Sequence, residues 1–237
     1  MRQANSPVFV IQHTAGEFLG LMEDHLEGRG IRFTYSRPFS ADGKLPATVE
    51  FAKGLILLGG GPWGTGGGRA VPTLTEEIAL TRSCLDRGIP VIGIGLGAQI
   101  LALAAGGGAD RADLTFEVGE SRRIEESALN GFLPARYPNV VFMRDWPVPP
   151  TGAAILAVDE KDRPALFQVN ENCLGFAGHP GAKVAMAEDL IMEFEEDPPD
   201  AARAIADLQV ARTAIEDALV HIMTGVVQVT GLMRPSD

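Results

Sequence analysis

One stretch near the middle of the chain, from Arg87 to Gly108, constrains the fold more than any other. It begins with a short apolar run, Ile89 to Ile94, passes through three alternate glycines, and becomes a helix-forming segment, Ala98 to Ala105. A buried strand that turns sharply into a helix is the arrangement in which α/β enzymes display a nucleophile, with free backbone N–H groups behind it. The residue expected at the apex is Gly95, which has no side chain with which to attack.

The segments before this stretch alternate between strand and helix patterns. Short apolar runs at 8–12, 31–35 and 54–58 predict strands, and apolar residues at helical spacing predict helices at 17–28 and 73–86. Strands and helices that alternate at this spacing favour parallel strands joined by right-handed crossovers. This half of the chain therefore predicts an α/β, doubly wound fold with a mainly parallel central sheet flanked by helices.

After Gly108 the pattern changes to short strands in quick succession, separated by prolines and glycines. Such spacing indicates antiparallel strands added beside the parallel core. The predicted strands are 114–118, 140–143, 154–158, 165–169 and 174–177.

The C-terminal part of the chain is predicted to form a helix at 183–195 and a helical extension at about 201–227. Apolar residues in the extension recur every three or four positions, which gives it one buried stripe. Beyond Leu219 the polar face becomes thinner, so this end either packs into the domain or meets another chain, as in a homodimer. We expect residues 1–237 to form a single domain with its core at about 7–195.

Composition argues against several classes of protein. The 237 residues carry 31 Asp plus Glu against 20 Lys plus Arg, a net charge of −11, which repels a phosphate backbone and disfavours nucleic acid as the main partner. No apolar run approaches the roughly 20 residues of a membrane helix, and no signal peptide is recognisable, so we expect a cytoplasmic protein without membrane contact. Cys84 and Cys173 are interpreted as small buried residues, not as a disulfide or a metal site.

The turn at Gly95 resembles the nucleophile elbow of class I glutamine amidotransferases, whose motif is Gly-x-Cys-x-Gly-x-Gln followed by a small, apolar helix. Gly93, Gly97 and Gln99 fit this motif. Gly95 stands where the family keeps its catalytic cysteine. In the family, that cysteine attacks the side-chain amide of glutamine, and the ammonia released passes to a synthase. The resemblance implies a flavodoxin-like, class I amidotransferase-like fold from which the reactive atom is missing.

A second similarity lies in the sequence around His179. The family usually has Gln-Phe-His-Pro-Glu after a late strand, where the histidine takes the proton of the thiol and the glutamate supports the imidazolium. His179 and Pro180 match this pattern, whereas Gly181 stands at the position of the glutamate. Two of the three members of the catalytic triad are therefore absent.

The glycine loop at 59–68 supplies a third similarity. Gly60 and Gly61 match the family's Gly-Gly-Pro turn, which gives one backbone N–H to the oxyanion hole, and Leu96 matches the residue that gives the other. Backbone donors survive the loss of side chains, so we expect a polarising pocket without a nucleophile. The resemblance also implies that Gln99 helps to bind a substrate amino acid. Trp63, an aromatic residue in the glycine loop, is a candidate for contact with a ligand or a partner.

Other signals are weaker. Glu117, Arg144, Asp145 and Trp146 lie in the region where some relatives place groups that contact the substrate, but the match assigns them no roles. The segment from Gly93 to Ala98 also fits the dinucleotide fingerprint Gly-x-Gly-x-x-Ala, with an acidic residue about twenty positions later. That fingerprint normally follows the first strand of its unit, whereas three predicted strands precede it here. We therefore predict no cofactor and no metal.

These observations lead to three functional hypotheses. The first is a pseudo-amidotransferase that has lost glutaminase activity and binds a partner synthase or ligase, or a glutamine-like small carboxylate or amide in the old pocket. The second is an amidotransferase or hydrolase-type enzyme of changed mechanism, which uses His179 and the oxyanion hole. The third is chemistry completed by the partner synthase. The paired changes at Gly95 and Gly181 favour a natural loss over a single engineered replacement.

Overall fold

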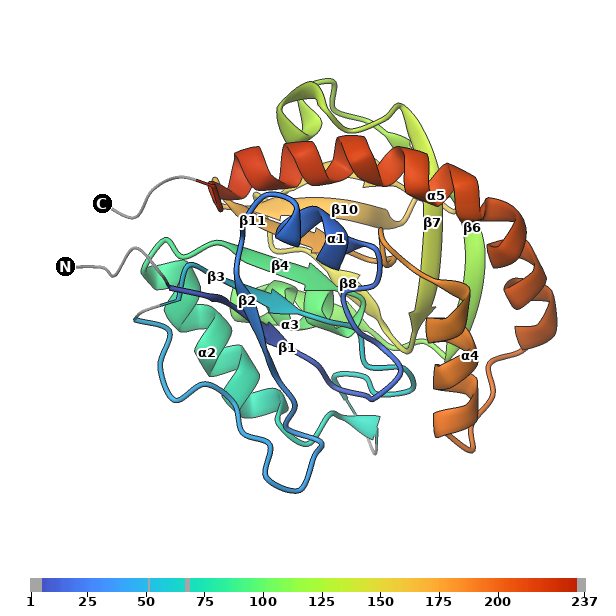
Figure 1. Cartoon of the computed structure of the whole chain (residues 1–237), viewed down its shortest axis with the longest axis horizontal. Coiled ribbons are helices and arrows are strands. Elements are labelled where there is room, and N and C mark those ends of the chain that lie inside the picture. Colours follow the sequence, from blue (N-terminus) through green and yellow to red (C-terminus); the bar gives the residue numbers. More distant parts are fainter. Residues whose placement is uncertain (1–5, 51, 67–68, 234–237) are drawn as a thin grey trace.

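The computed structural model describes residues 6–50, 52–66 and 69–233 of the chain (Figure 1). Within these residues, nine strands form one sheet in the order β2-β1-β3-β4-β11-β10-β9-β6-β7. The first five strands of this order pair in parallel, and the remaining pairs are antiparallel. The parallel strands are β2 (Phe33–Ser36), β1 (Val8–Ile11), β3 (Gly54–Leu57), β4 (Val91–Ile94) and β11 (Cys173–Phe176).

The antiparallel strands extend the sheet on the β11 side. They are β10 (Pro164–Val169), β9 (Ala154–Val158), β6 (Thr115–Arg123) and β7 (Arg136–Met143). Strand β9 matches the predicted 154–158, whereas β10, β6 and β7 are longer than predicted. The strand predicted at 174–177 among the antiparallel ones is β11, which instead pairs in parallel with β4. A separate pair, β5 (Gly108–Asp110) and β8 (Trp146–Val148), was not predicted, because neither segment is long enough to give a repeating pattern.

Helices cover both faces of the parallel part of the sheet, which confirms the predicted doubly wound fold. Figure 1 shows α1 (Met22–Glu27) close to α5 (Ala201–Thr230), and both contribute to one apolar core. A second core on the other face contains α2 (Leu74–Asp86) and α3 (Leu96–Ala104). Because side chains alternate along a strand, Ile56 of β3 faces the first core and Leu55 faces the second.

The remaining helices are a short 3₁₀ helix, η2 (Ala128–Gly131), and α4 (Val184–Glu193). The helix α5 continues to Thr230, three residues beyond the predicted end, and Gly231 ends it in the left-handed conformation at φ 68°. Its apolar residues Ile222, Met223, Val226 and Val227 are buried in the core, so this end packs against the rest of the chain. None of the described helices is long and apolar enough to span a membrane.

The prediction of a helix at 17–28 was wrong at its start, because α1 begins only at Met22. Residues 13–21 form bends and turns, and Gly20 has a φ of +63° that ends any helical path there. Backbone groups of this segment bond to distant residues instead: Leu21 N–H donates to Gly181 O at 2.9 Å. The segment therefore lies directly against the predicted site.

Candidate functional site

The turn between β4 and α3 has the geometry of a nucleophile elbow. Gly95 lies between the two elements with φ 54° and ψ −114°, a conformation that strains any residue with a side chain. Its N–H donates to Phe176 O at 2.9 Å, which fixes the turn to the neighbouring strand β11. A β-carbon at position 95 would lie 3.4 Å from Gly59 Cα, an ordinary van der Waals distance. The apex therefore has space for a side chain and carries none.

The glycines on either side of the apex are needed for close packing. A β-carbon on Gly97 would overlap the carbonyl group of Leu57, and one on Gly93 would overlap the carbonyl of Gly97. The first turn of α3 thus lies directly against β3, and Gly97 N–H donates to Leu58 O at 3.1 Å. This packing holds the N-terminus of α3 next to Gly95.

His179 lies after β11, and both nitrogens of its ring bond to backbone groups. Nε2 donates to Phe18 O at 2.8 Å, and Nδ1 accepts from Gly181 N–H at 3.1 Å. Burial lowers the pKa of His179 to about 4, although the bond to Phe18 O favours the charged form. The imidazole is therefore neutral at pH 7 and carries its proton on Nε2. Neither nitrogen is free to take a proton from a group at position 95.

Gly181 packs against Leu21 and Met22 at the start of α1. A β-carbon at position 181 would lie 3.0 Å from both Cγ and the backbone nitrogen of Met22, closer than such atoms normally approach. A glutamate at the third triad position would therefore require the segment around Met22 to move. The shift that a β-carbon itself requires is a few tenths of an ångström.

Glu17, which no pattern in the sequence indicated as a site residue, lies with its carboxyl group at the predicted oxyanion hole. Glu17 Oε2 accepts from Gly61 N–H at 3.1 Å, and the side chain is 4% exposed. A β-carbon on Gly59 would overlap this carboxyl group, so the loop approaches Glu17 only because residue 59 is glycine. One of the predicted oxyanion donors is thus already bonded to a group of the protein itself.

The other two predicted oxyanion residues lie next to each other. A β-carbon on Gly60 would overlap Leu96 Cδ2, so the glycine loop packs against the first residue of α3. Leu96 N–H is in the first turn of its helix and has no acceptor within that helix. The structure therefore places Gly60 against Leu96, the residue that follows the apex, with Gly61 next in the loop.

Burial raises the pKa of the Glu17 carboxyl to about 7, and the negative charge of Glu193 adds to this effect. The Gly61 N–H and the charge of His13 act in the opposite direction without compensating for burial. One sequence signal could have identified Glu17: it follows β1 closely, and the carboxyl ends of parallel strands are where α/β proteins place their sites. The helical spacing of the neighbouring apolar residues instead placed Glu17 in a predicted helix.

A buried ion pair supports the glycine loop from the other side. His13 Nε2 lies 2.7 Å from Glu77 Oε2, and both side chains are fully buried. His13 Nδ1 lies 2.9 Å from Gly59 O, which can only accept, so this nitrogen carries a proton as well. Burial alone would lower the pKa of His13, but Glu77, together with Gly59 O and Glu17, raises it. The ring is therefore an imidazolium, and Thr73 Oγ1 donates to the second oxygen of Glu77 at 2.6 Å.

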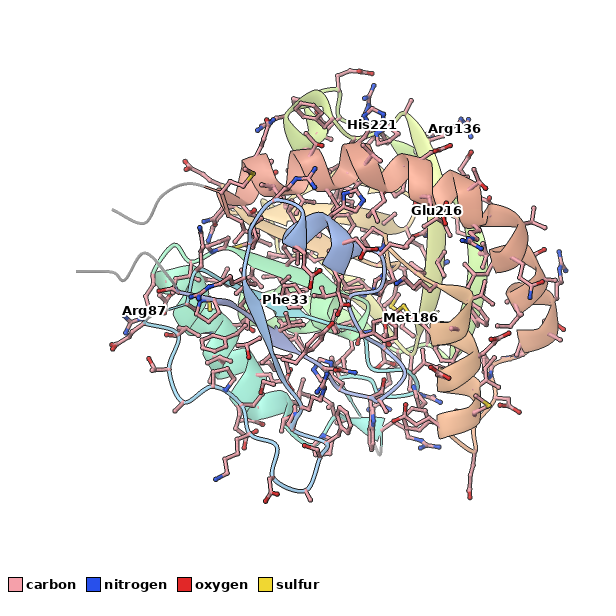
Figure 2. All side chains as sticks on the ribbon, viewed as in Figure 1. Phe33, Arg87, Arg136, Met186, Glu216 and His221 are labelled. Atoms are coloured by element: carbon pink, nitrogen blue, oxygen red, sulfur yellow. The ribbon has the colours of Figure 1, made fainter. Side chains whose placement is uncertain are left out.

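Glu17, Gly95 and His179 line one small cavity of about 30 Å³, which has space for water but not for a larger ligand. Helix α4 lines one side of the cavity, and Figure 2 shows its Met186 on the side of the helix that faces the centre of the molecule. A glutamine side chain does not fit this space. The other lining residues are Ile94, Phe116, Val140, Phe142, Ala177, Ala182, Lys183, Met186, Ala187, Leu190 and Leu208.

Gln99 and Trp63, the two predicted ligand-binding residues, both contact the protein interior. Gln99 is fully buried, and its Nε2 donates to Arg144 O at 2.7 Å. Trp63 is partly buried against the core formed by α2 and α3. Among the residues that the structure describes, no group of three or more His, Cys, Asp or Glu side chains forms a candidate metal site.

The four weaker candidates fall into two groups. Arg144 Nε donates to Pro62 O at 3.1 Å, and Asp145 accepts from Thr65 N–H at 3.1 Å, so both support the glycine loop. Glu117 and Trp146 instead surround Arg163. Glu117 Oε2 lies 3.3 Å from its guanidinium, which also lies 3.5 Å above the indole ring of Trp146. The second group is therefore separate from the glycine loop.

The Gln99→Met variant is expected to lose about 1 kcal/mol of unfolding free energy, because the partly buried Arg144 carbonyl loses its donor while the side-chain volume is kept. Urea denaturation of the variant and the wild type measures this difference. An unchanged stability would show that the hydrogen bond has no net structural value and would leave ligand binding as the reason for Gln99.

Comparison with known proteins gives a consistent result. The family model described as "Glutamine amidotransferase class-I" matches residues 29–191. No curated protein matches the chain. The solved structure of a glutamine amido transferase from Methylobacillus flagellatus is 24% identical, with a TM-score of 0.79 over 94% of this chain and 95% of that chain.

Two further solved structures are similar in fold. A glutamine amidotransferase from Thermotoga maritima is 23% identical, with a TM-score of 0.77 over 95% of this chain and 98% of that chain. A putative GMP synthase subunit from Thermoplasma acidophilum is 15% identical, with a TM-score of 0.57 over 88% of this chain and 98% of that chain.

Proposed function

The chain belongs to the class I glutamine amidotransferase family, and on this premise we propose that it is a member without glutaminase activity that acts as the binding subunit of a partner synthase or ligase. The observation that carries the proposal is Gly95 at the apex of the elbow. Covalent catalysis of amide hydrolysis needs a nucleophile at this point, and a hydrogen atom cannot replace a thiol.

The surroundings of the apex support the same proposal. His179 has both ring nitrogens bonded to backbone groups, and Glu17 takes up the N–H of Gly61. The cavity of about 30 Å³ is too small for glutamine or a similar amide. These features favour a partner-binding subunit over a protein that binds a glutamine-like molecule in the old pocket. They also favour it over an enzyme of changed mechanism, because the neutral, bonded His179 is a poor general base.

Partner binding has two lines of support. One similar structure is a putative GMP synthase subunit, which by its name is part of a larger assembly. In addition, α5 carries the exposed apolar side chains of Val210 (86% exposed) and Val220 (51% exposed). A homodimer through α5 stays a prediction beside the synthase partner. Co-purification with a synthetase or ligase supports the proposal, and a chain that never associates with either counts against it.

The decisive experiment measures glutamate release from glutamine by the wild type and by the Gly95→Cys variant. We expect no sustained turnover by the wild type. We expect the variant to stay about three or more orders of magnitude below an active class I amidotransferase assayed in parallel, because its histidine lacks a carboxylate partner and a free nitrogen. Circular dichroism verifies that the variant is folded.

Two results would contradict the proposal. One is sustained turnover by the wild type that the His179→Ala substitution abolishes. The other is a Gly95→Cys variant with the activity of the parallel enzyme, since this would mean that the triad needs no carboxylate at position 181.

A further inference from the structure

We infer that the cavity lined by Glu17, Gly95 and His179 is a carboxyl-binding site, which the side chain of Glu17 occupies in the wild type. When this side chain is removed, the site binds a free short-chain monocarboxylic acid. The inference rests on the proposed function in one respect only, namely that position 95 carries no nucleophile. It adds the chemical class of molecule for which the remaining pocket is built.

The contacts of the carboxyl group are those of a bound ligand. One oxygen accepts from Gly61 N–H at 3.1 Å, and the group lies against Gly59, where a β-carbon would overlap it. The imidazolium of His13 bonds to Gly59 O at 2.9 Å on the opposite side of the loop and supplies a buried positive charge nearby. A backbone donor and a glycine surface together make a site for a carboxyl group, and the nearby cation offsets only part of the cost of burying a negative charge there.

Hydrogen bonds of the backbone around Glu17 hold its side chain in the cavity. Glu17 N–H donates to Thr14 Oγ1 at 3.2 Å, which holds the local turn. Glu193 at the end of α4 accepts from Ala15 N–H at 3.0 Å and from Gly16 N–H at 2.9 Å. The segment is thus anchored on both its own side and the side of α4. Exchange of Glu17 for a molecule from solution would require these bonds to break, so the wild-type site stays filled.

The apolar walls define which carboxylic acid fits. Apart from Glu17 and His179, the cavity is lined mainly by apolar side chains such as Phe116, Phe142 and Leu190. Truncation of Glu17 adds the volume of the deleted atoms to the existing 30 Å³. The enlarged space suits formate, acetate or propionate, whereas the ammonium group of an amino acid would be buried against these apolar walls.

The raised pKa of Glu17 adds a dependence on pH. Burial holds the pKa of the carboxyl at about 7, so the pocket prefers the protonated form. A free carboxylate must therefore bind together with a proton near neutral pH. Binding of acetate is expected to be stronger at pH 6 than at pH 8.

The test measures the binding of sodium acetate to the Glu17→Ala variant by calorimetry and by thermal unfolding, with sodium chloride at equal ionic strength as the salt control. We expect the dissociation constant for acetate to be at least tenfold lower for Glu17→Ala than for the wild type. Glu17→Gln keeps the pocket filled and should behave as the wild type. Glu27→Ala removes the same atoms from an exposed position nearby and is the matched control.

Each outcome decides the matter. Acetate that stabilises only Glu17→Ala supports the inference, and so does a Glu17→Ala chain that folds only when acetate is present. Equal effects on all variants overturn it. A Glu17→Ala chain that is unaffected by acetate, or that stays unfolded with acetate while Glu17→Gln folds, also overturns it. Glutaminase activity of the wild type would refute the proposed function without changing these binding results.

Discussion

The Glu77→Ala variant is expected to lose about 3–5 kcal/mol of unfolding free energy at pH 7, the largest effect of any single substitution considered for this site. Glu77 lies 2.7 Å from the imidazole of His13, and both side chains are fully buried. Removal of the carboxylate leaves a buried imidazolium without a counter-charge. The ring must then either stay charged in an apolar interior or lose its Nε2 proton, and in both cases Nε2 has lost its hydrogen-bond partner. Both results destabilise the folded state.

Urea denaturation measures this loss, and the next residue provides the control. Glu76 is on the same helix and is exposed, so Glu76→Ala should change the unfolding free energy by no more than about 0.5 kcal/mol. The double variant His13→Ala, Glu77→Ala should lose less than the sum of the two single losses, because neither partner is then left unpaired. A Glu77→Ala variant as stable as Glu76→Ala would mean that the pair is not an ion pair.

The fold was predictable where local pattern and tertiary structure agree. The apolar run before Gly95 forms β4, and the glycines that follow it occur where α3 packs against β3. The helix predicted from residue 17 shows the opposite case. Its apolar spacing is compatible with a helix, but Phe18 O and Leu21 N–H bond to His179 and Gly181 instead. These partners lie too far along the chain for a local pattern to reveal them.

The same distinction explains the candidate site. Gly95, His179 and Gly61 could be identified because their order and neighbours match a family motif. Glu17 and His13 could not, because their partners Gly61 and Glu77 are 44 and 64 positions away, and no motif includes them. A sequence indicates which catalytic side chains are missing. Which group of the protein fills the space is decided by the three-dimensional packing.

The Glu17→Gln variant is expected to be about 3 kcal/mol more stable than the wild type at pH 8 and equally stable at pH 4. In the folded protein burial raises the pKa of Glu17 to about 7, from an ordinary value of 4.5. Between these two values the unfolded chain releases the proton while the folded chain keeps it, so the wild type loses stability as the pH rises. Glutamine is uncharged at every pH and still offers an oxygen to Gly61 N–H, so the variant avoids this loss.

The measurement is the difference in unfolding free energy between Glu17→Gln and the wild type from pH 4 to pH 8. The pKa of His179 is about 4, so His179 makes both proteins more stable as the pH rises from 4 to 6.5, and its contribution cancels in the difference. Glu27→Gln at an exposed position should show no such rise. A difference that is constant from pH 4 to pH 8 would mean that the Glu17 carboxyl ionises as it does in water. The pocket would then be open to solvent, and its small size would no longer argue against the binding of a glutamine-like molecule.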